Sequence, residues 1–95
     1  MNREIVDFVN TVNRRTLTNQ RQRSLHTLIR LQSASTTGWV SLSTLRSAKV
    51  TPMSLRNLRR ECYENLDVVC QKREGKVFYR LNNLTLSKVQ RALTI

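Results

Sequence analysis

Hydrophobic residues recur every three or four positions in the first third of the chain, which is the spacing of one face of an α-helix. The pattern predicts a first helix over residues 2–16, and its apolar side holds Ile5, Phe8, Val9 and Val12. It predicts a second helix that Thr18 caps and that ends near residue 32. Residues 33–38 are rich in serine and threonine and end in glycine, so we expect a surface loop there.

Two further helices joined by a tight turn are expected in the middle of the chain. A brief extended piece at 39–40 leads to a helix over 41–48, and Lys49-Val50 makes the turn. Thr51-Pro52 then favours a new helix start, because threonine accepts hydrogen bonds from free amides and proline at the first helical position loses none.

The helix that starts at Pro52 is expected to run to about Glu64. Its apolar residues share one side, at the spacing i, i+3 and i+7: Leu55, Leu58 and Cys62. Helical geometry then places on the opposite side Met53, Arg56, Asn57, Arg60 and Glu64. This helix therefore has one apolar side and one side rich in arginine.

The hydrophobic period changes after residue 66. Two runs rich in β-branched and aromatic residues flank Glu74-Gly75, which predicts a β-hairpin whose tip carries Lys72, Arg73 and Lys76. A last amphipathic helix, capped by Thr85 or Ser87, closes the chain. The predicted fold class is α+β, mostly α with a small β-hairpin, in a single domain over residues 1–95.

The charge of the chain narrows the choice of partner. Seventeen lysines and arginines against six acidic residues give a formal net charge of +11, which points to DNA, RNA or an anionic membrane. No segment approaches the ~20 apolar residues of a membrane-spanning helix, and Glu4 and Asp7 are untypical of a signal peptide. We therefore expect an intracellular, cytoplasmic protein that associates with DNA and not with a membrane.

Residues that often carry chemistry are few. Cys62 and Cys70 match no zinc-ligand spacing when His26 is the only histidine, so we interpret the cysteines as core residues and the histidine as structural. Two glycines cannot build a glycine-rich phosphate loop. We expect no enzymatic activity, no metal, no cofactor and no small-molecule ligand.

The aromatic residues are also sparse. Trp39 is expected to pack in the core beside the sheet, and Phe78 and Tyr79 are expected on opposite faces of one strand, so one would be buried and the other exposed. No aromatic series typical of a single-strand stacking platform is evident. The aromatic pattern thus favours duplex DNA over RNA.

The order of these elements resembles the winged helix-turn-helix family over Arg23 to Leu81. In this family the turn is usually followed by Val-Ser/Thr, then by a Ser/Thr-Val/Leu pair, then by another leucine. The residues that match are Val50-Thr51, Ser54-Leu55 and Leu58, whereas Lys49 stands where many members have glycine and Leu45 where many have alanine. The resemblance implies a winged-helix core over 18–81, with extra helices in 1–17 and 82–95.

The resemblance further implies that the second helix of the motif enters the major groove of DNA. Arg56, Asn57 and Arg60 suit base edges, and Met53 suits a thymine methyl group. Thr51 and Ser54 would meet phosphate at the start of that helix. The hairpin would act as the wing, where Lys72, Arg73 and Lys76 reach the backbone or the minor groove; further candidate phosphate contacts are Arg46, Lys49, Arg21 and Arg23.

The function predicted from the sequence is sequence-specific binding of double-stranded DNA by a small regulator of transcription. Four alternatives stay open: a plasmid or phage replication factor, a partition factor, an RNA-binding protein, and a winged-helix adapter that docks on proteins. In the adapter, the apolar faces of the first and last helices would be the contact surface. The same faces could form a homodimer that places two recognition helices about one turn of DNA apart.

Overall fold

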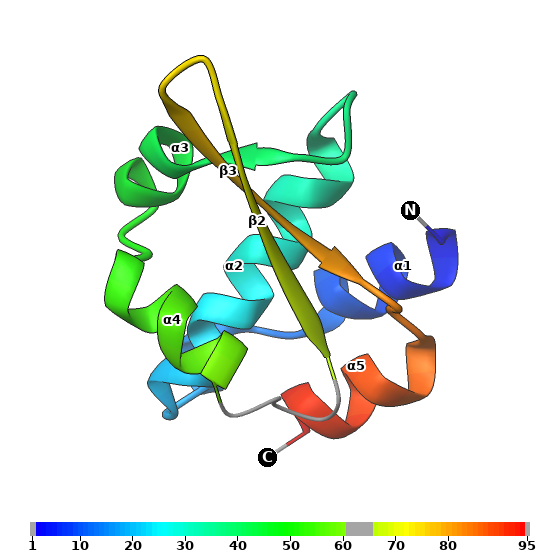
Figure 1. Ribbon diagram of the computed structural model, residues 1–95. Coiled ribbons are helices and arrows are strands. Elements are labelled where there is room, and N and C mark those ends of the chain that lie inside the picture. Colours follow the sequence, from blue (N-terminus) through cyan, green and yellow to red (C-terminus); the bar gives the residue numbers. More distant parts are fainter. Residues whose placement is uncertain (1, 61–65, 95) are drawn as a thin grey trace.

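The structure, a computed structural model, describes residues 2–60 and 66–94. Within these residues the chain is α+β, with five α-helices and a three-stranded antiparallel sheet (Figure 1). The elements in chain order are α1 (Arg3–Thr11), η1, a 3-10 turn (Arg14–Thr16), α2 (Gln20–Ala34), β1 (Val40–Ser41), α3 (Leu42–Ser47), α4 (Pro52–Arg60), β2 (Asp67–Arg73), β3 (Lys76–Asn82) and α5 (Leu86–Leu93).

The sheet has the strand order β1-β3-β2, and the predicted hairpin is confirmed. Arg73 pairs with Lys76, so Glu74 and Gly75 alone form the connection, with φ angles of 51° and 78°. Positive φ at both central residues is the geometry of a tight turn whose twist matches that of the flanking strands. The short strand β1 pairs with β3 through Val40 and Tyr79.

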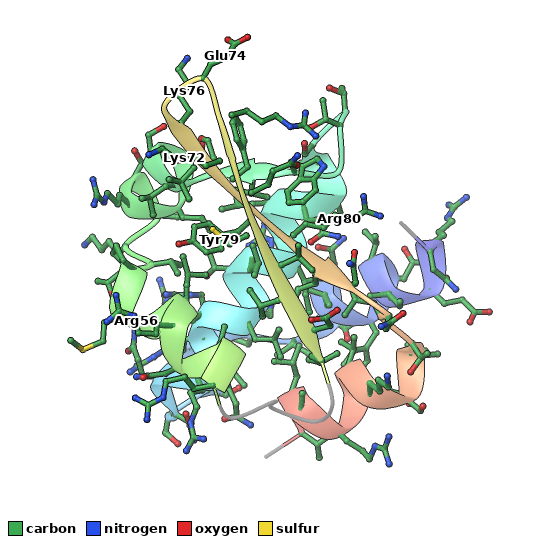
Figure 2. The ribbon with its side chains drawn as sticks, in the orientation of Figure 1. Arg56, Lys72, Glu74, Lys76, Tyr79 and Arg80 are labelled. Atoms are coloured by element: carbon green, nitrogen blue, oxygen red, sulfur yellow. The ribbon has the colours of Figure 1, made fainter. Side chains whose placement is uncertain are left out.

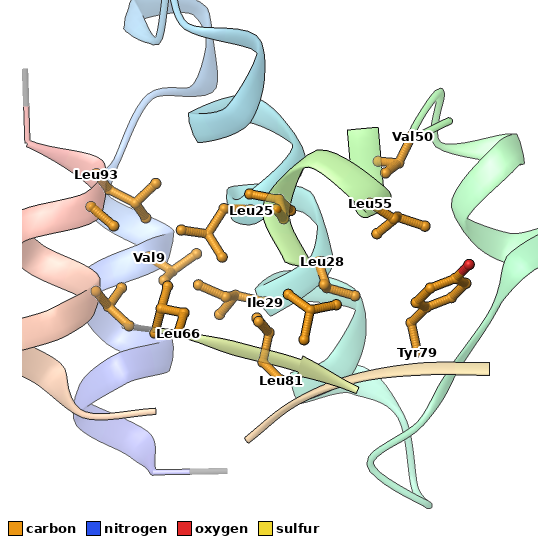
Figure 3. Close-up of a cluster of buried hydrophobic side chains, with 14 of the residues drawn as sticks. Val9, Leu25, Leu28, Ile29, Val50, Leu55, Leu66, Tyr79, Leu81 and Leu93 are labelled. Atoms are coloured by element: carbon orange, nitrogen blue, oxygen red, sulfur yellow. The ribbon is translucent and has the colours of Figure 1, made fainter. Parts of the chain in front are cut away.

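The core lies between α2 and the sheet and is closed on one side by α4. Leu25, Leu28 and Ile29 of α2 are fully buried, and Leu55 of α4 and Leu81 of β3 lie close to them (Figure 3). Each apolar side chain that is removed from water contributes roughly 1.5–3 kcal/mol, so this interface holds α2, α4 and the sheet together.

Helices α1 and α5 lie together at the far end of the sheet from the hairpin turn (Figure 1). Their apolar residues are buried against each other and against α2, namely Ile5, Val9, Val89, Ala92 and Leu93. These faces, which the sequence offered for docking or dimer formation, are therefore occupied within the chain. Among the described residues, Met53 is the exposed large hydrophobic side chain.

Three boundaries differ from those that the sequence predicts. The first helix ends at Thr11 instead of residue 16, because Val12 is extended and the separate turn η1 follows, with Leu17 buried behind it. The second helix begins after Asn19 instead of Thr18, since the Asn19 side chain accepts a hydrogen bond of 2.8 Å from the Arg21 amide. It continues to Ala34, so the loop that follows is shorter than expected.

The expected end of α4 at Glu64 and the inward placement of Cys62 fall outside the described residues. The same holds for the outward placement of Glu64. No helix in residues 2–60 and 66–94 is long and apolar enough to cross a membrane.

Candidate nucleic-acid interface

The connection between α3 and α4 is a closed turn made by Ala48, Lys49 and Val50. The Val50 amide donates to the Leu45 carbonyl at 2.8 Å, and the Lys49 amide donates to the Arg46 carbonyl at 2.9 Å. This pair of bonds is the Schellman ending of a helix, in which the first of the two donor residues takes the left-handed conformation. Lys49 takes that conformation with a φ of 66°. The lysine thus occupies a backbone position that glycine usually fills.

The start of α4 agrees with the predicted cap. The Ser54 amide donates to Thr51 Oγ1 at 3.1 Å, and the two hydroxyl oxygens lie 3.0 Å apart. Thr51 is therefore the N-cap residue of α4, as the sequence predicts. Both side chains lie at the amino end of the helix, where backbone amides and the helix dipole favour an anion.

The two sides of α4 differ in burial as predicted. Leu55 and Leu58 are buried in the core, whereas 69% of the Met53 surface is exposed. Arg56, Asn57 and Arg60 are exposed on the same helix (Figure 2 labels Arg56). No acidic side chain in the described part of the chain forms an ion pair with these arginines. Their donors are therefore available to an outside acceptor.

The cations of the hairpin do not all lie together. Lys72 and Lys76 are both exposed, Lys76 beside Glu74 at the turn and Lys72 further down the hairpin (Figure 2). Arg73, which the sequence groups with them, is directed along the sheet: its Nη2 donates to Gln71 Oε1 at 2.9 Å, and its Cζ lies 5.7 Å from the centre of the Trp39 ring. The predicted cluster of three is therefore a pair of exposed lysines on the hairpin and an arginine held against an aromatic ring.

The remaining candidate cations fall into two groups. Arg46 and Lys49 are exposed at the turn between α3 and α4, next to the start of α4. Arg21 and Arg23 are half-buried in the first turn of α2, and Arg23 Nη2 donates to Gln20 Oε1 at 3.0 Å. Arg46 and Lys49 thus add exposed positive charge next to the start of α4. The two arginines of α2 are less accessible, because both are half-buried.

Trp39 does not pack in the core as expected. Val40 is buried and pairs with the buried Tyr79, so the pleat turns Trp39 to the other face of the sheet. There it is half-buried, with Arg73 and Arg80 placing their Cζ atoms 5.7 and 5.8 Å from its ring centre. The sequence offered no local signal for this orientation, because β1 has only two residues.

The prediction for Phe78 and Tyr79 is confirmed in its main part. Tyr79 belongs to the core, and Phe78 lies on the opposite face, where it is half-buried and lines a hollow together with Trp39. Trp39 and Phe78 therefore line the same hollow, which the sequence did not indicate. Cys70 is half-buried and packs against the edge of the core.

His26 occupies a structural position. It is buried, and its Nε2 donates to the Val9 carbonyl at 3.0 Å, which ties α2 to α1. Burial lowers the pKa of His26 below its usual value of 6.5, because the charged form loses its hydration. Within the described residues no group of three or more histidine, cysteine or acidic side chains could hold a metal ion.

Comparison of the chain with protein-family models, with curated proteins and with solved structures gives no match.

Proposed function

We propose that this chain is a winged helix-turn-helix protein that binds double-stranded DNA in a sequence-specific manner, as a small regulator of transcription. The order α2, β1, α3, α4, β2, β3 and the pairing of β1 with β3 support this assignment. In it, α3 and α4 are the helix-turn-helix and the β2–β3 hairpin is the wing.

The single observation that carries the proposal is the exposed side of α4. Arg56, Asn57 and Arg60 extend from a helix whose other side is anchored by Leu55 and Leu58. Arginine can donate two hydrogen bonds to guanine, and asparagine can both donate to and accept from adenine. A helix that carries these side chains fits the width of the major groove.

Phosphate contacts would fix the orientation of α4 in the groove. The amino end of α4, with Thr51 and Ser54, suits one phosphate. Arg46 and Lys49 at the preceding turn suit the same strand, and Lys72 and Lys76 on the hairpin suit the backbone further along the duplex. These contacts depend little on sequence and supply much of the affinity.

The test is binding of a fluorescent random-sequence duplex, followed by anisotropy at increasing salt. About five phosphate contacts predict a loss of affinity of roughly two to three decades between ~50 and ~200 mM salt. Lys76→Gln, which removes a proposed phosphate contact, should weaken binding of this duplex severalfold, whereas the matched variant Arg3→Gln, which removes the same charge from α1, should have little effect. Absence of duplex binding at low salt would overturn the proposal.

A further inference from the structure

The sheet has one face that no helix covers. Val68, Tyr79 and Leu81 point to the helices and are buried, so their neighbours along each strand point away from the helices. We call this uncovered side the outer face. The strand registers place on it Val69, Gln71, Arg73, Lys76, Phe78 and Arg80, with Asp67 at the end remote from the hairpin turn. Trp39, which precedes the buried Val40, lies on the same side.

Trp39 lies at the β1 edge of the outer face. The guanidinium groups of Arg73 and Arg80 both lie within 6 Å of its ring centre, at 5.7 and 5.8 Å. Neither arginine forms an ion pair within the described part of the chain. Two cations that lie over an aromatic ring, with no acidic partner among the described residues, offer their remaining donors to an anion.

A hollow of about 360 Å³ opens beside the Trp39 ring. It lies at the β1 edge of the sheet, where Leu31 and Ala34 of α2, Thr44 of α3 and Phe78 of β3 line it. A flat ring that needs apolar contact on its faces and polar contact at its edge fits such a lining. Nucleobases have this combination of surfaces.

We propose that the outer face is a second nucleic-acid site, which binds a single strand. An unpaired base lies at the hollow on the β1 edge, against Phe78 and the part of the Trp39 ring that the two guanidinium groups leave open, and the phosphates on either side of it meet Arg73 and Arg80. Single strands are the favoured ligand because the bases of a duplex are already stacked on each other. The outer face belongs to the sheet, whereas the proposed duplex site is on α4, so the two sites are separable by mutation.

The sequence supplies a direct reporter, because Trp39 is the only tryptophan in the chain. The probe is an eight-nucleotide oligothymidine, and the measured quantity is the emission of Trp39 during titration. We expect the oligonucleotide to change this emission in a saturable manner. An abasic oligonucleotide of the same length carries the same phosphates without bases and should bind at least tenfold more weakly.

Two competing explanations give different results. If the abasic strand binds as tightly as oligothymidine, the face attracts phosphate alone and the proposal fails. If an eight-residue glutamate peptide changes the emission as strongly as the oligonucleotide, the face binds acidic protein segments instead, and the proposal fails equally. No emission change with any probe would also overturn it.

Matched variants separate this site from α4. Arg80→Gln and Arg56→Gln remove the same charge from different faces. Arg80→Gln should weaken oligothymidine binding about tenfold and leave nearly unchanged the binding of a duplex selected for high affinity, and Arg56→Gln should do the reverse. Equal losses for both ligands in both variants would contradict a separate site. If the protein does not bind duplex DNA, but Arg80→Gln still weakens oligothymidine binding and Arg56→Gln does not, only the function proposed for α4 is refuted.

Replacement of the tryptophan tests the stacking itself, with a labelled oligonucleotide followed by anisotropy. Trp39→Phe keeps an aromatic face and should bind within a few-fold of the original protein. Trp39→Leu keeps apolar volume without a π surface and should lose roughly tenfold to a hundredfold. Thermal unfolding of both variants checks that they remain folded, and equal binding by both folded variants would refute stacking.

Discussion

Gln32 and Leu81, which are 49 positions apart in the chain, are joined by two hydrogen bonds. Gln32 Nε2 donates to the Leu81 carbonyl at 3.1 Å, and the Leu81 amide donates to Gln32 Oε1 at 2.7 Å. Strand β1 covers the edge of β3 only at Phe78 and Tyr79, so the edge beyond it lacks a strand partner. The Gln32 side chain takes the place of that partner and ties α2 to the sheet.

Removal of the Gln32 amide should therefore destabilise the fold. Gln32→Ala leaves a buried amide and a buried carbonyl of Leu81 without partners, which should lower the free energy of unfolding by about 1–3 kcal/mol. The control is Gln90→Ala on the exposed side of α5, expected within about 0.5 kcal/mol of the original protein. Urea unfolding measures both, and equal stability of the two variants would refute the assigned role.

Lys49 should be replaceable by glycine with a gain in stability. Its φ of 66° crowds the Cβ of any residue except glycine. The free energy of unfolding of Lys49→Gly should therefore be about 1 kcal/mol higher than that of Lys49→Ala. The comparison uses alanine because both variants lose the same charge. An alanine variant as stable as the glycine variant would show that the turn stores no strain. Both variants should bind duplex DNA somewhat more weakly if Lys49 contacts phosphate.

The buried His26 predicts a pH dependence of stability. Its pKa is lowered in the folded protein, so between that value and 6.5 the unfolded chain binds a proton that the folded chain does not bind. The free energy of unfolding should consequently fall as the pH drops below about 6.5. In His26→Gln, which keeps a donor for the Val9 carbonyl, this part of the decline should disappear. Parallel pH profiles for the two proteins from pH 7.5 to 5 would exclude His26 as the cause.

The sequence predicted the elements that local chemistry determines. Thr51-Pro52 marked the start of α4, Glu74-Gly75 marked the hairpin turn, and the spacing of Leu55 and Leu58 identified the buried side of α4. In each case the residues that give the signal lie within a few positions of the element that they specify. The exposed arginines of α4 were predicted for the same reason, because helical periodicity fixes their side relative to the leucines.

Features that depend on distant partners were missed. The orientation of Trp39 follows from the pairing of Val40 with Tyr79, and the position of Arg73 follows from the ring of Trp39. Neither pairing has a local signature in a stretch as short as β1. The early end of α1 has the same origin, because burial of Leu17 requires the chain to leave the helix after Thr11.

The central claim is that α4 reads base sequence while the hairpin turn contacts phosphate. The most direct test selects a preferred duplex from a random library and then compares Arg56→Ala with Lys76→Ala on that duplex and on a scrambled one. The account predicts that Arg56→Ala costs about 1–3 kcal/mol on the preferred duplex and much less on the scrambled one, whereas Lys76→Ala weakens both by the same factor. Equal losses on both duplexes for Arg56→Ala would contradict the assignment of α4 as the recognition helix.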